Sequence, residues 1–534
     1  MANTLKASPQ GLAIVDRSRR RKGWTKTRTP AWWNDAYTTQ ATLKRFWRGI
    51  AIQRDNFIAI CRAVGIEDWE AIVETEVFEV SDSAELETPS PPEKRIDWGE
   101  APEIPTFYGR ALELRKLEHW IVRDRCKLIT LLGMGGIGKT ALAVKLVAQI
   151  EQDFDGVIWR SLLPAPPLLT LLDRLIQFCS RDPAGIRSAA RETLKTDNPQ
   201  QGITQAISHL QQRRYLIVLD EAETILRSHS GQPLRRGEQY REGYEDYGEF
   251  FKRLGSDRHQ SCIAIVSREK PGEIVAYEGQ MLPVRSLHLS GLQAEDALHL
   301  CRTQGFSCSD NELKMLTNFY SGNPLALKVI ATLIQEVFNG DVASFLNQNT
   351  LVLGDRLREL VGQQVERLSE LETEVLYWLA LVPEPLSLSQ LSANLLFPPT
   401  QSQLLEVLAA LERRSLIEKM TGETEAYYML QPLVMKYAME KSIEQALDEI
   451  ETVLEERDIE AFKVLKNHAF HPLPSSKSSE FHLLERLKKG LQMRLRCDER
   501  QIEKKLSTLA PLLQDRSPRA IGYVRSNLQA IFKH

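Results

Sequence analysis

The sequence lacks the features of a secreted, zinc-binding or membrane-spanning protein. Its seven cysteines are scattered, without a Cys-x-x-Cys pair or a histidine at zinc spacing, which argues against a disulfide framework and a zinc site. The N-terminus has no apolar signal-like run, and no apolar stretch approaches the roughly 20 residues that span a bilayer. We therefore expect reduced cysteines, a cytoplasmic protein and no membrane contact.

A strong net charge is also lacking, because 68 basic side chains nearly balance 71 acidic ones. The distribution is uneven: residues 1–48 hold eleven basic and two acidic side chains, a local charge of +9, whereas residues 49–106 hold four basic and fourteen acidic ones, a local charge of −10. With 534 residues, of which 43% are hydrophobic, the chain is long enough for about three to five folded domains.

One stretch carries a specific chemical signal. Leu128–Leu132 is wholly apolar, as expected of a central strand in a parallel sheet, and glycine follows it directly. Apolar residues then recur at helical spacing from Leu142 to Ile150. The loop between strand and helix matches the P-loop pattern Gly-x4-Gly-Lys-Thr. Its candidate phosphate-binding residues are Gly133, Gly135, Gly136, Gly138, Lys139 and Thr140.

This spacing has a physical reason. Residues without side chains let several backbone N–H groups converge on phosphate oxygens, and the N-terminus of the following helix attracts the same anion. The Lys139 ammonium can reach the β- and γ-phosphates, and the Thr140 hydroxyl can ligate Mg²⁺. The loop therefore predicts a nucleoside triphosphate with Mg²⁺; the plain alternative is a glycine-rich turn that binds nothing.

The motifs around this loop resemble the NB-ARC branch of the STAND signal-transduction ATPases, the class of plant disease-resistance proteins and apoptosome scaffolds. Phe-Tyr-Gly-Arg precedes the P-loop, and Gly-Asn-Pro-Leu-Ala stands where the family has Gly-Leu-Pro-Leu-Ala. The resemblance implies ATP or ADP as the nucleotide, with Phe107, Tyr108 and Arg110 beside the adenine and ribose. It also implies that Pro324 starts a helix packed on the adenine face.

The later motifs follow the order of the same family. A buried strand, Tyr215–Leu219, ends at Asp220, whose carboxylate would hold Mg²⁺ opposite the P-loop. Glu221 beside it could position or deprotonate the attacking water, although acids also simply cap strand ends. Arg268 follows another apolar strand; the resemblance implies that its planar guanidinium reads the γ-phosphate, and an ordinary surface charge is the alternative.

The sequence departs from the family at one phosphate contact. Where the family carries Met-His-Asp, with a histidine on the β-phosphate of ADP, this chain has Leu430-Gln431-Pro432. Gln431 can donate a hydrogen bond to a phosphate but carries no positive charge.

We predict a multidomain protein with an α/β P-loop NTPase core on a parallel sheet, flanked by helical domains. The predicted boundaries are 1–78 for a helix-turn-helix-like helical domain, 79–104 for an acidic Pro/Ser linker, 105–285 for the nucleotide-binding domain, 286–365 for a helical subdomain, 366–445 for a winged-helix domain and 446–534 for a helical C-terminal tail.

The N-terminal domain resembles the later helices of phage-repressor helix-turn-helix domains. In that family the helix at residues 39–48, with Thr39 as its N-cap, would enter the major groove and place Lys44, Arg45 and Arg48 near phosphates. The run Arg17–Arg28 could add a basic arm. Nucleic-acid contact, protein interaction and a purely structural role all remain open for this domain.

Taken together, the motifs favour an ATP/ADP-binding molecular switch in signalling or defence, with slow ATP hydrolysis and nucleotide-dependent oligomerisation. Its expected partners are an adenine nucleotide and either further copies of itself or a separate sensor or effector protein. One alternative is a DNA-binding transcriptional regulator gated by the ATPase core. Another is a constitutive ATPase.

Overall fold

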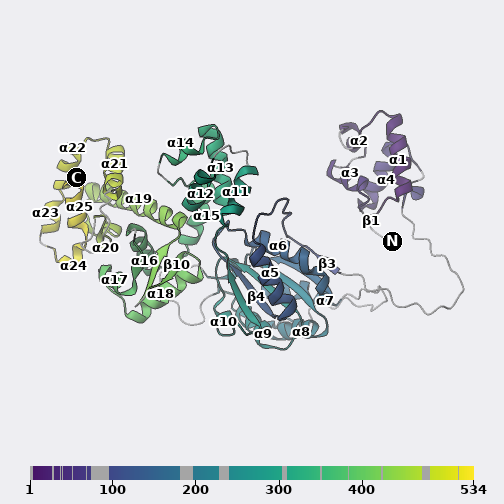
Figure 1. Ribbon diagram of the computed structural model, residues 1–534, viewed down its shortest axis with the longest axis horizontal. Helices are drawn as coiled ribbons and strands as arrows, with labels where there is room; N and C mark the ends of the chain where they lie inside the picture. Colours follow the sequence, from purple (N-terminus) through teal and green to yellow (C-terminus); the bar gives the residue numbers. More distant parts are fainter. Residues whose placement is uncertain are drawn as a thin grey trace. The chain divides into compact units, whose positions relative to one another are not determined.

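A computed structural model gives the structure of the chain. It describes residues 4–26, 29–36, 38, 40–50, 52–67, 69–73, 95–180, 196–227, 240–303, 309–348, 351–382, 384–422, 425–471, 482–514 and 516–533. These residues belong to two compact units, Met1–Ser90 and Pro91–His534 (Figure 1).

The N-terminal unit is a small helical domain around an aromatic core. It contains β1 (Thr4–Leu5), α1 (Pro9–Arg21), α2 (Pro30–Asp35), α3 (Gln40–Trp47), β2 (Ile52–Gln53), α4 (Arg54–Ala63) and the short turn η1 (Glu70–Ile72). Trp32, Phe46 and Phe57 are fully buried between the helices. The predicted helix at residues 39–48 is present as α3. Thr39 lies outside the described residues, and the helix-turn-helix assignment stays a prediction.

The structure describes residues 17–26 of the run Arg17–Arg28, and its role as a basic arm stays a prediction. Its first arginines lie in α1, where Asp16 forms ion pairs with Arg19 and Arg20. Arg19 also donates to the Trp24 carbonyl, and Lys26 lies over the Trp47 ring. Acid pairing and aromatic stacking therefore hold these cations on the helical domain.

The larger unit begins with a six-stranded parallel sheet. Its strands are β3 (Arg95–Asp97), β4 (Leu128–Leu132), β5 (Gly156–Ser161), β6 (Tyr215–Asp220), β7 (Cys262–Ser267) and β8 (Val284–His288), in the spatial order β3-β5-β6-β7-β4-β8. This confirms the predicted α/β core. Residues 95–97 were assigned to the linker, but they pair with β5 as an edge strand. A three-residue strand is too short to show a period in its sequence.

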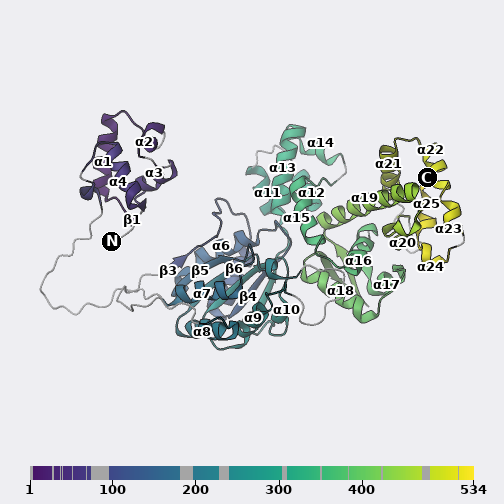
Figure 2. The ribbon, with the colours of Figure 1, turned by 180° about the vertical axis from the view of Figure 1, so that it is seen from behind.

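Helices cover both faces of this sheet (Figure 1, Figure 2). Leu216 and Val218 of β6 point to the face packed by α5 and α6, whereas Ile217 and Leu219 point to the face packed by α7, α8 and α9. Burial on both faces explains why these strands are apolar at every position. The helices are α5 (Ala111–Glu118), η2 (His119–Arg123), α6 (Lys139–Ile150), η3 (Glu151–Asp153), α7 (Leu168–Cys179), α8 (Pro199–Gln212), η4 (Ala222–Ile225), α9 (Asp246–Ser256) and α10 (Gly272–Val275).

The following part of the chain is helical with one small antiparallel sheet. It contains α11 (Ala294–Thr303), α12 (Asp310–Phe319), α13 (Pro324–Phe338), α14 (Val342–Leu346), α15 (Asp355–Val365), α16 (Glu370–Leu381), β9 (Leu386–Ser387), α17 (Leu388–Asn394), α18 (Gln401–Arg413), β10 (Ile417–Thr421) and β11 (Ala426–Leu430). The sheet order is β10-β11-β9. The winged-helix assignment of residues 366–445 stays a prediction.

The C-terminal helices share one continuous hydrophobic core with the elements from α11 onward. They are α19 (Pro432–Glu456), η5 (Ile459–Ala461), α20 (Val464–Asn467), α21 (His482–Leu495), α22 (Glu499–Ser507), α23 (Ala510–Gln514), α24 (Pro518–Ile521) and α25 (Val524–Lys533). The boundary predicted between residues 445 and 446 falls inside α19. Among the helices of the described ranges, none combines the length and the apolar character needed to cross a bilayer.

The C-terminal core contains a buried histidine, His468. His468 is 2% exposed, its ring nitrogens lie within 3.1 Å of the Val464 and Glu374 carbonyl oxygens, and the Trp378 ring packs beside it. Burial lowers the pKa of His468 to about 4, because the charged ring cannot be hydrated there.

We expect the wild-type melting temperature to fall more between pH 7 and pH 5 than that of His468→Gln. The stability that a neutral buried histidine contributes is present above its unfolded pKa of 6.5 and is lost as the pH falls toward about 4. Thermal unfolding of the full chain at both pH values measures the difference. Equal pH dependence of the two proteins would contradict the prediction.

Candidate nucleotide-binding site

The P-loop connects β4 to α6 in a conformation that requires glycine. Gly133, Gly136 and Gly138 have φ angles of 147°, 76° and 97°, a region that side chains disfavour. Gly135 leaves room for a neighbour, since a Cβ atom there would lie 2.5 Å from the Leu360 Cδ2 atom of α15 and the leucine side chain would have to shift. Because these positions have no side chains, the loop exposes its backbone N–H groups and also packs closely against α15. We call the part of the chain from α11 to α25 the helical region.

Lys139 lies inside the loop that it follows. The residue is 8% exposed, and its Nζ atom donates to the Gly133 and Met134 carbonyls at 2.8 and 3.1 Å. Burial lowers the pKa of its ammonium group to about 8. The positive charge is therefore held at the centre of the glycine loop, as the motif predicts.

The two predicted magnesium ligands face each other. Thr140, at the start of α6, donates its hydroxyl to the Asp220 Oδ1 atom at 3.3 Å, and the Glu221 N–H donates to the same oxygen at 2.9 Å. Burial raises the pKa of Asp220 to about 6. A hydroxyl and a carboxylate are the hard oxygen donors that Mg²⁺ prefers, so this pair fits the ion.

Glu221 is turned away from this pair. Its backbone is left-handed, with a φ of 59°, and its carboxylate accepts a hydrogen bond from the Ser161 hydroxyl at 2.6 Å, at the end of β5. The predicted water-positioning group is therefore engaged by a neighbouring strand.

A second acid, Glu223, was missed in the sequence. It is 8% exposed, pairs with the Arg268 Nε atom at 3.0 Å and accepts the Arg268 backbone N–H at 3.0 Å. The only signal was a further acid three residues beyond Asp220, which sequence reasoning cannot distinguish from a solvated one.

The predicted adenine-side residues separate from one another. Arg110 is buried and donates to the Ile137 carbonyl of the P-loop at 3.1 Å and to the Ser290 carbonyl at 2.7 Å. Phe107 packs in the core of the sheet and α6, whereas Tyr108 packs on the helical core with its hydroxyl 2.8 Å from the Thr303 hydroxyl. These residues fasten the two regions together around the site.

A cavity of about 130 Å³ lies between the P-loop and the helical region. Met134 and Ile137 line it from the P-loop, and Asn323 lines it from the start of α13. Glu418 of β10 and Gln431, the N-cap of α19, line the remaining side. Gln431 is therefore brought next to the P-loop, as the resemblance implied. Phe107 and Tyr108 are not among its lining residues.

Asn323, which replaces the usual leucine of the family motif, has a clear structural role. It is the N-cap of α13, and its Oδ1 atom accepts from the Leu325 and Ala326 N–H groups. Its Nδ2 atom donates to the Gly135 carbonyl at 3.1 Å. Pro324 follows at the first helical position, where its ring faces the P-loop: a Cβ on Gly138 would lie 4.0 Å from it.

The family of this region follows from a direct match. Residues 111–225, which contain the P-loop and Asp220, match the model of the NB-ARC domain. Residues 111–225 of the chain form an NB-ARC domain.

Two curated proteins are similar to the chain, which spans 37% and 7% of their lengths. The chain is 39% identical over 479 residues to an uncharacterized WD repeat-containing protein of Nostoc sp.; the match covers 84% of this chain and spans 37% of that protein. It is also 38% identical to the disease resistance protein RPS5 of Arabidopsis thaliana over 66 residues. This match covers 12% of this chain and 7% of that protein.

Among solved structures, the chain is similar to a STAND protein with a tetratricopeptide repeat sensor from Pyrococcus horikoshii. The similarity has a TM-score of 0.29 at 18% identity and covers 81% of this chain and 58% of the other.

We expect Asn323→Ala to lower the free energy of unfolding by about 1–3 kcal/mol, because an N-cap is lost and the buried Gly135 carbonyl loses its donor. It should also weaken nucleotide binding by displacing the NB-ARC P-loop. Denaturant unfolding and titration with ADP measure both effects. Asn318→Ala, at an exposed position of α12, is the matched control and should change neither.

Proposed function

We propose that this chain is an ATP/ADP-dependent molecular switch that acts in signalling or defence. The observation that carries the proposal is the direct attachment of the P-loop to the helical region. Asn323 binds the Gly135 carbonyl, the Leu325 N–H donates to the Gly136 carbonyl at 3.3 Å, and Leu360 lies against Gly135. A phosphate that rearranges this loop also changes the packing of α13 and α15.

The residues fit an adenine nucleotide with Mg²⁺. The N–H groups of the glycine loop and the Lys139 ammonium would hold the phosphates, and Thr140 and Asp220 would hold the ion. When bound, Mg²⁺ neutralises charge on the phosphate oxygens. The two nucleotides must differ by several kcal/mol in their preference for the two conformations to give a sharp switch, and Arg268 is our candidate for that difference.

Slow hydrolysis is part of the proposal. The Glu221 carboxylate is bound by Ser161, so it has to leave this partner before it can act on a water molecule. We therefore propose turnover far below the range of about 1–100 s⁻¹ that is typical of kinases, which separates a switch from a constitutive ATPase.

We further propose that the ATP-bound chain associates with itself or with a separate sensor or effector. The alternative, a DNA-binding regulator, has weaker support. It depends on Lys44, Arg45 and Arg48, which are exposed near or on α3, and exposed cations on a helix are more often simply solvated.

We expect Lys139→Ala to lose about 10- to 150-fold in ATP affinity, since a charge-assisted hydrogen bond contributes about 1.5–3 kcal/mol. Isothermal titration measures the affinity, and light scattering should show a larger particle with ATP for the wild type but not for the variant. Lys145→Ala, which removes an exposed lysine from the same helix, is the control. Equal nucleotide binding by Lys139→Ala and wild type would refute the site.

Asp220→Asn should abolish the dependence of ATP binding on Mg²⁺, because the amide is a poor ligand for this ion. We expect wild type to bind ATP more tightly with Mg²⁺ than with a chelator, and the variant to bind equally under both conditions. A variant that still responds to Mg²⁺ would remove Asp220 from the metal site.

A further inference from the structure

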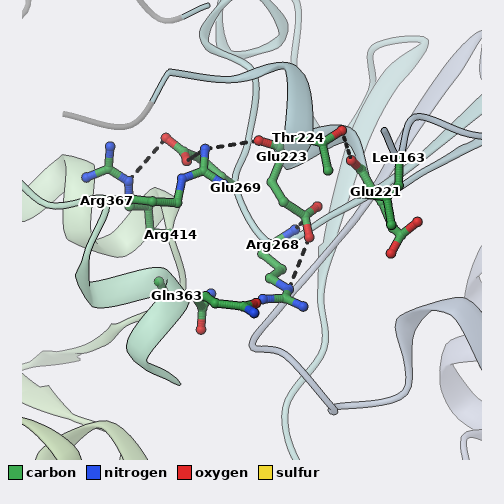
Figure 3. A pocket seen from close by; sticks show the side chains of 10 residues that line it. Leu163, Glu221, Glu223, Thr224, Arg268, Glu269, Gln363, Arg367 and Arg414 are labelled. Atoms are coloured by element: carbon green, nitrogen blue, oxygen red, sulfur yellow. Dashed lines mark hydrogen bonds and ion pairs between the residues drawn. The ribbon is translucent and has the colours of Figure 1, made fainter. Parts of the chain in front are cut away.

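The Arg268 guanidinium is held by a carboxylate that is fixed to the backbone. The Glu223 Oε2 atom accepts hydrogen bonds from the Arg268 N–H at 3.0 Å and from the Ser267 hydroxyl at 3.2 Å, both at the end of β7. The Oε1 atom pairs with the Arg268 Nε atom at 3.0 Å. Figure 3 shows the Glu223 carboxylate directed at this guanidinium, whereas the Glu221 carboxylate points away.

The consequence concerns the direction of the arginine side chain. An arginine has five N–H donors in a rigid plane, so a partner that occupies Nε also orients the two terminal nitrogens. Glu223 can therefore set where these nitrogens point without contacting a phosphate itself. Because η4 directly follows β6, and β7 lies beside β4, the strand that leads into the P-loop, the pair lies at the same edge of the sheet as Lys139.

The short helix η4, which contains Glu223, is bound by a residue of the helical region. Arg367, between α15 and α16, donates to the carbonyls of Glu223 and Leu226 at 3.0 and 3.1 Å, at the two ends of η4. Arg367 also lies 3.5 Å from the carboxylate of Glu269, the residue after Arg268. Both the turn and the strand end are thus tied to one side chain from outside the nucleotide-binding sheet.

Further ion pairs anchor this connection. Glu269 pairs with Arg414 at 3.3 Å, and Arg414 pairs with Glu372 of α16 at 2.9 Å. Arg414 is 4% exposed, so water screens these pairs little. A cavity of about 340 Å³ adjoins the chain of charges and leaves space for Arg268 and Arg367 to change rotamer.

We propose that Glu223 is the positioning residue for Arg268, and that Arg367 links this pair to the helical region. Discrimination between ATP and ADP then depends on Glu223 and Arg367, although neither contacts the γ-phosphate. This inference rests on the proposed function, because it assigns the residues that make Arg268 selective.

The test compares the ratio of ADP to ATP dissociation constants in the full chain with Mg²⁺. We expect Arg268→Ala to lower this ratio most. Glu223→Gln and Arg367→Ala should lower it by about 3- to 30-fold, because residues coupled in one network change each other's effect by about that much. ADP affinity should not change. In the Arg268→Ala background, neither further substitution should have an additional effect on the ratio.

The ADP affinity and the double variants separate positioning from a merely structural role. A loss of ATP and ADP affinity by equal factors in Glu223→Gln, or an effect that adds to that of Arg268→Ala, would overturn the proposal. Glu223→Asp keeps the charge but shortens the reach, and it should lower the ratio too. Glu249→Gln removes a partly exposed carboxylate of α9 and should leave the ratio unchanged.

The wild-type protein decides whether the proposed function itself stands. If wild type has the same conformation and the same particle size with ATP as with ADP, the switch fails and this inference fails with it. If wild type prefers ATP and Glu223→Gln keeps the full preference, the switch stands and only the role of Glu223 is refuted.

Discussion

The larger unit depends on the close packing of the glycine-rich P-loop against helices α13 and α15. The glycine loop has to leave space for phosphate oxygens on one side, and on the other side Leu325 and Leu360 approach it so closely that Cβ atoms at Gly136 and Gly135 would overlap them. Because dense packing does not deform continuously, the proposed switch would pass a change on the phosphate side to the helices.

Charge provides a second connection between the same regions. The carboxyl ends of β6 and β7 place Asp220, Glu223 and Arg268 at one edge of the sheet, where Lys139 also lies. From this edge, alternating charges run through Glu269 and Arg414 to α16. Buried pairs of this kind contribute little net stability, but breaking one leaves a buried charge, so they hold one arrangement of the two regions.

The sequence predicted what depends on local patterns and missed what depends on contacts distant in the chain. Strands β4, β6 and β7 and the P-loop were predicted correctly, because an apolar run next to a glycine pattern is a local signal. Glu223 and Asn323 were not assigned their roles, since their partners, Arg268 and the Gly135 carbonyl, are 45 and 188 residues away. No sequence pattern shows that Asp16 and the tryptophans engage cations of the run Arg17–Arg28.

Helix α19 connects the candidate site to the C-terminal helices. It begins at Pro432, directly after Gln431 in the cavity beside the P-loop, and its 25 residues run without a break to Glu456 among the C-terminal helices (Figure 1). At 1.5 Å per residue the helix is about 37 Å long. A rotation of about 10° at its first turn would swing the opposite end by about 6 Å. If α19 moves as a rigid rod, a small rearrangement at the phosphate site would displace Glu456 and the C-terminal helices by several times that distance.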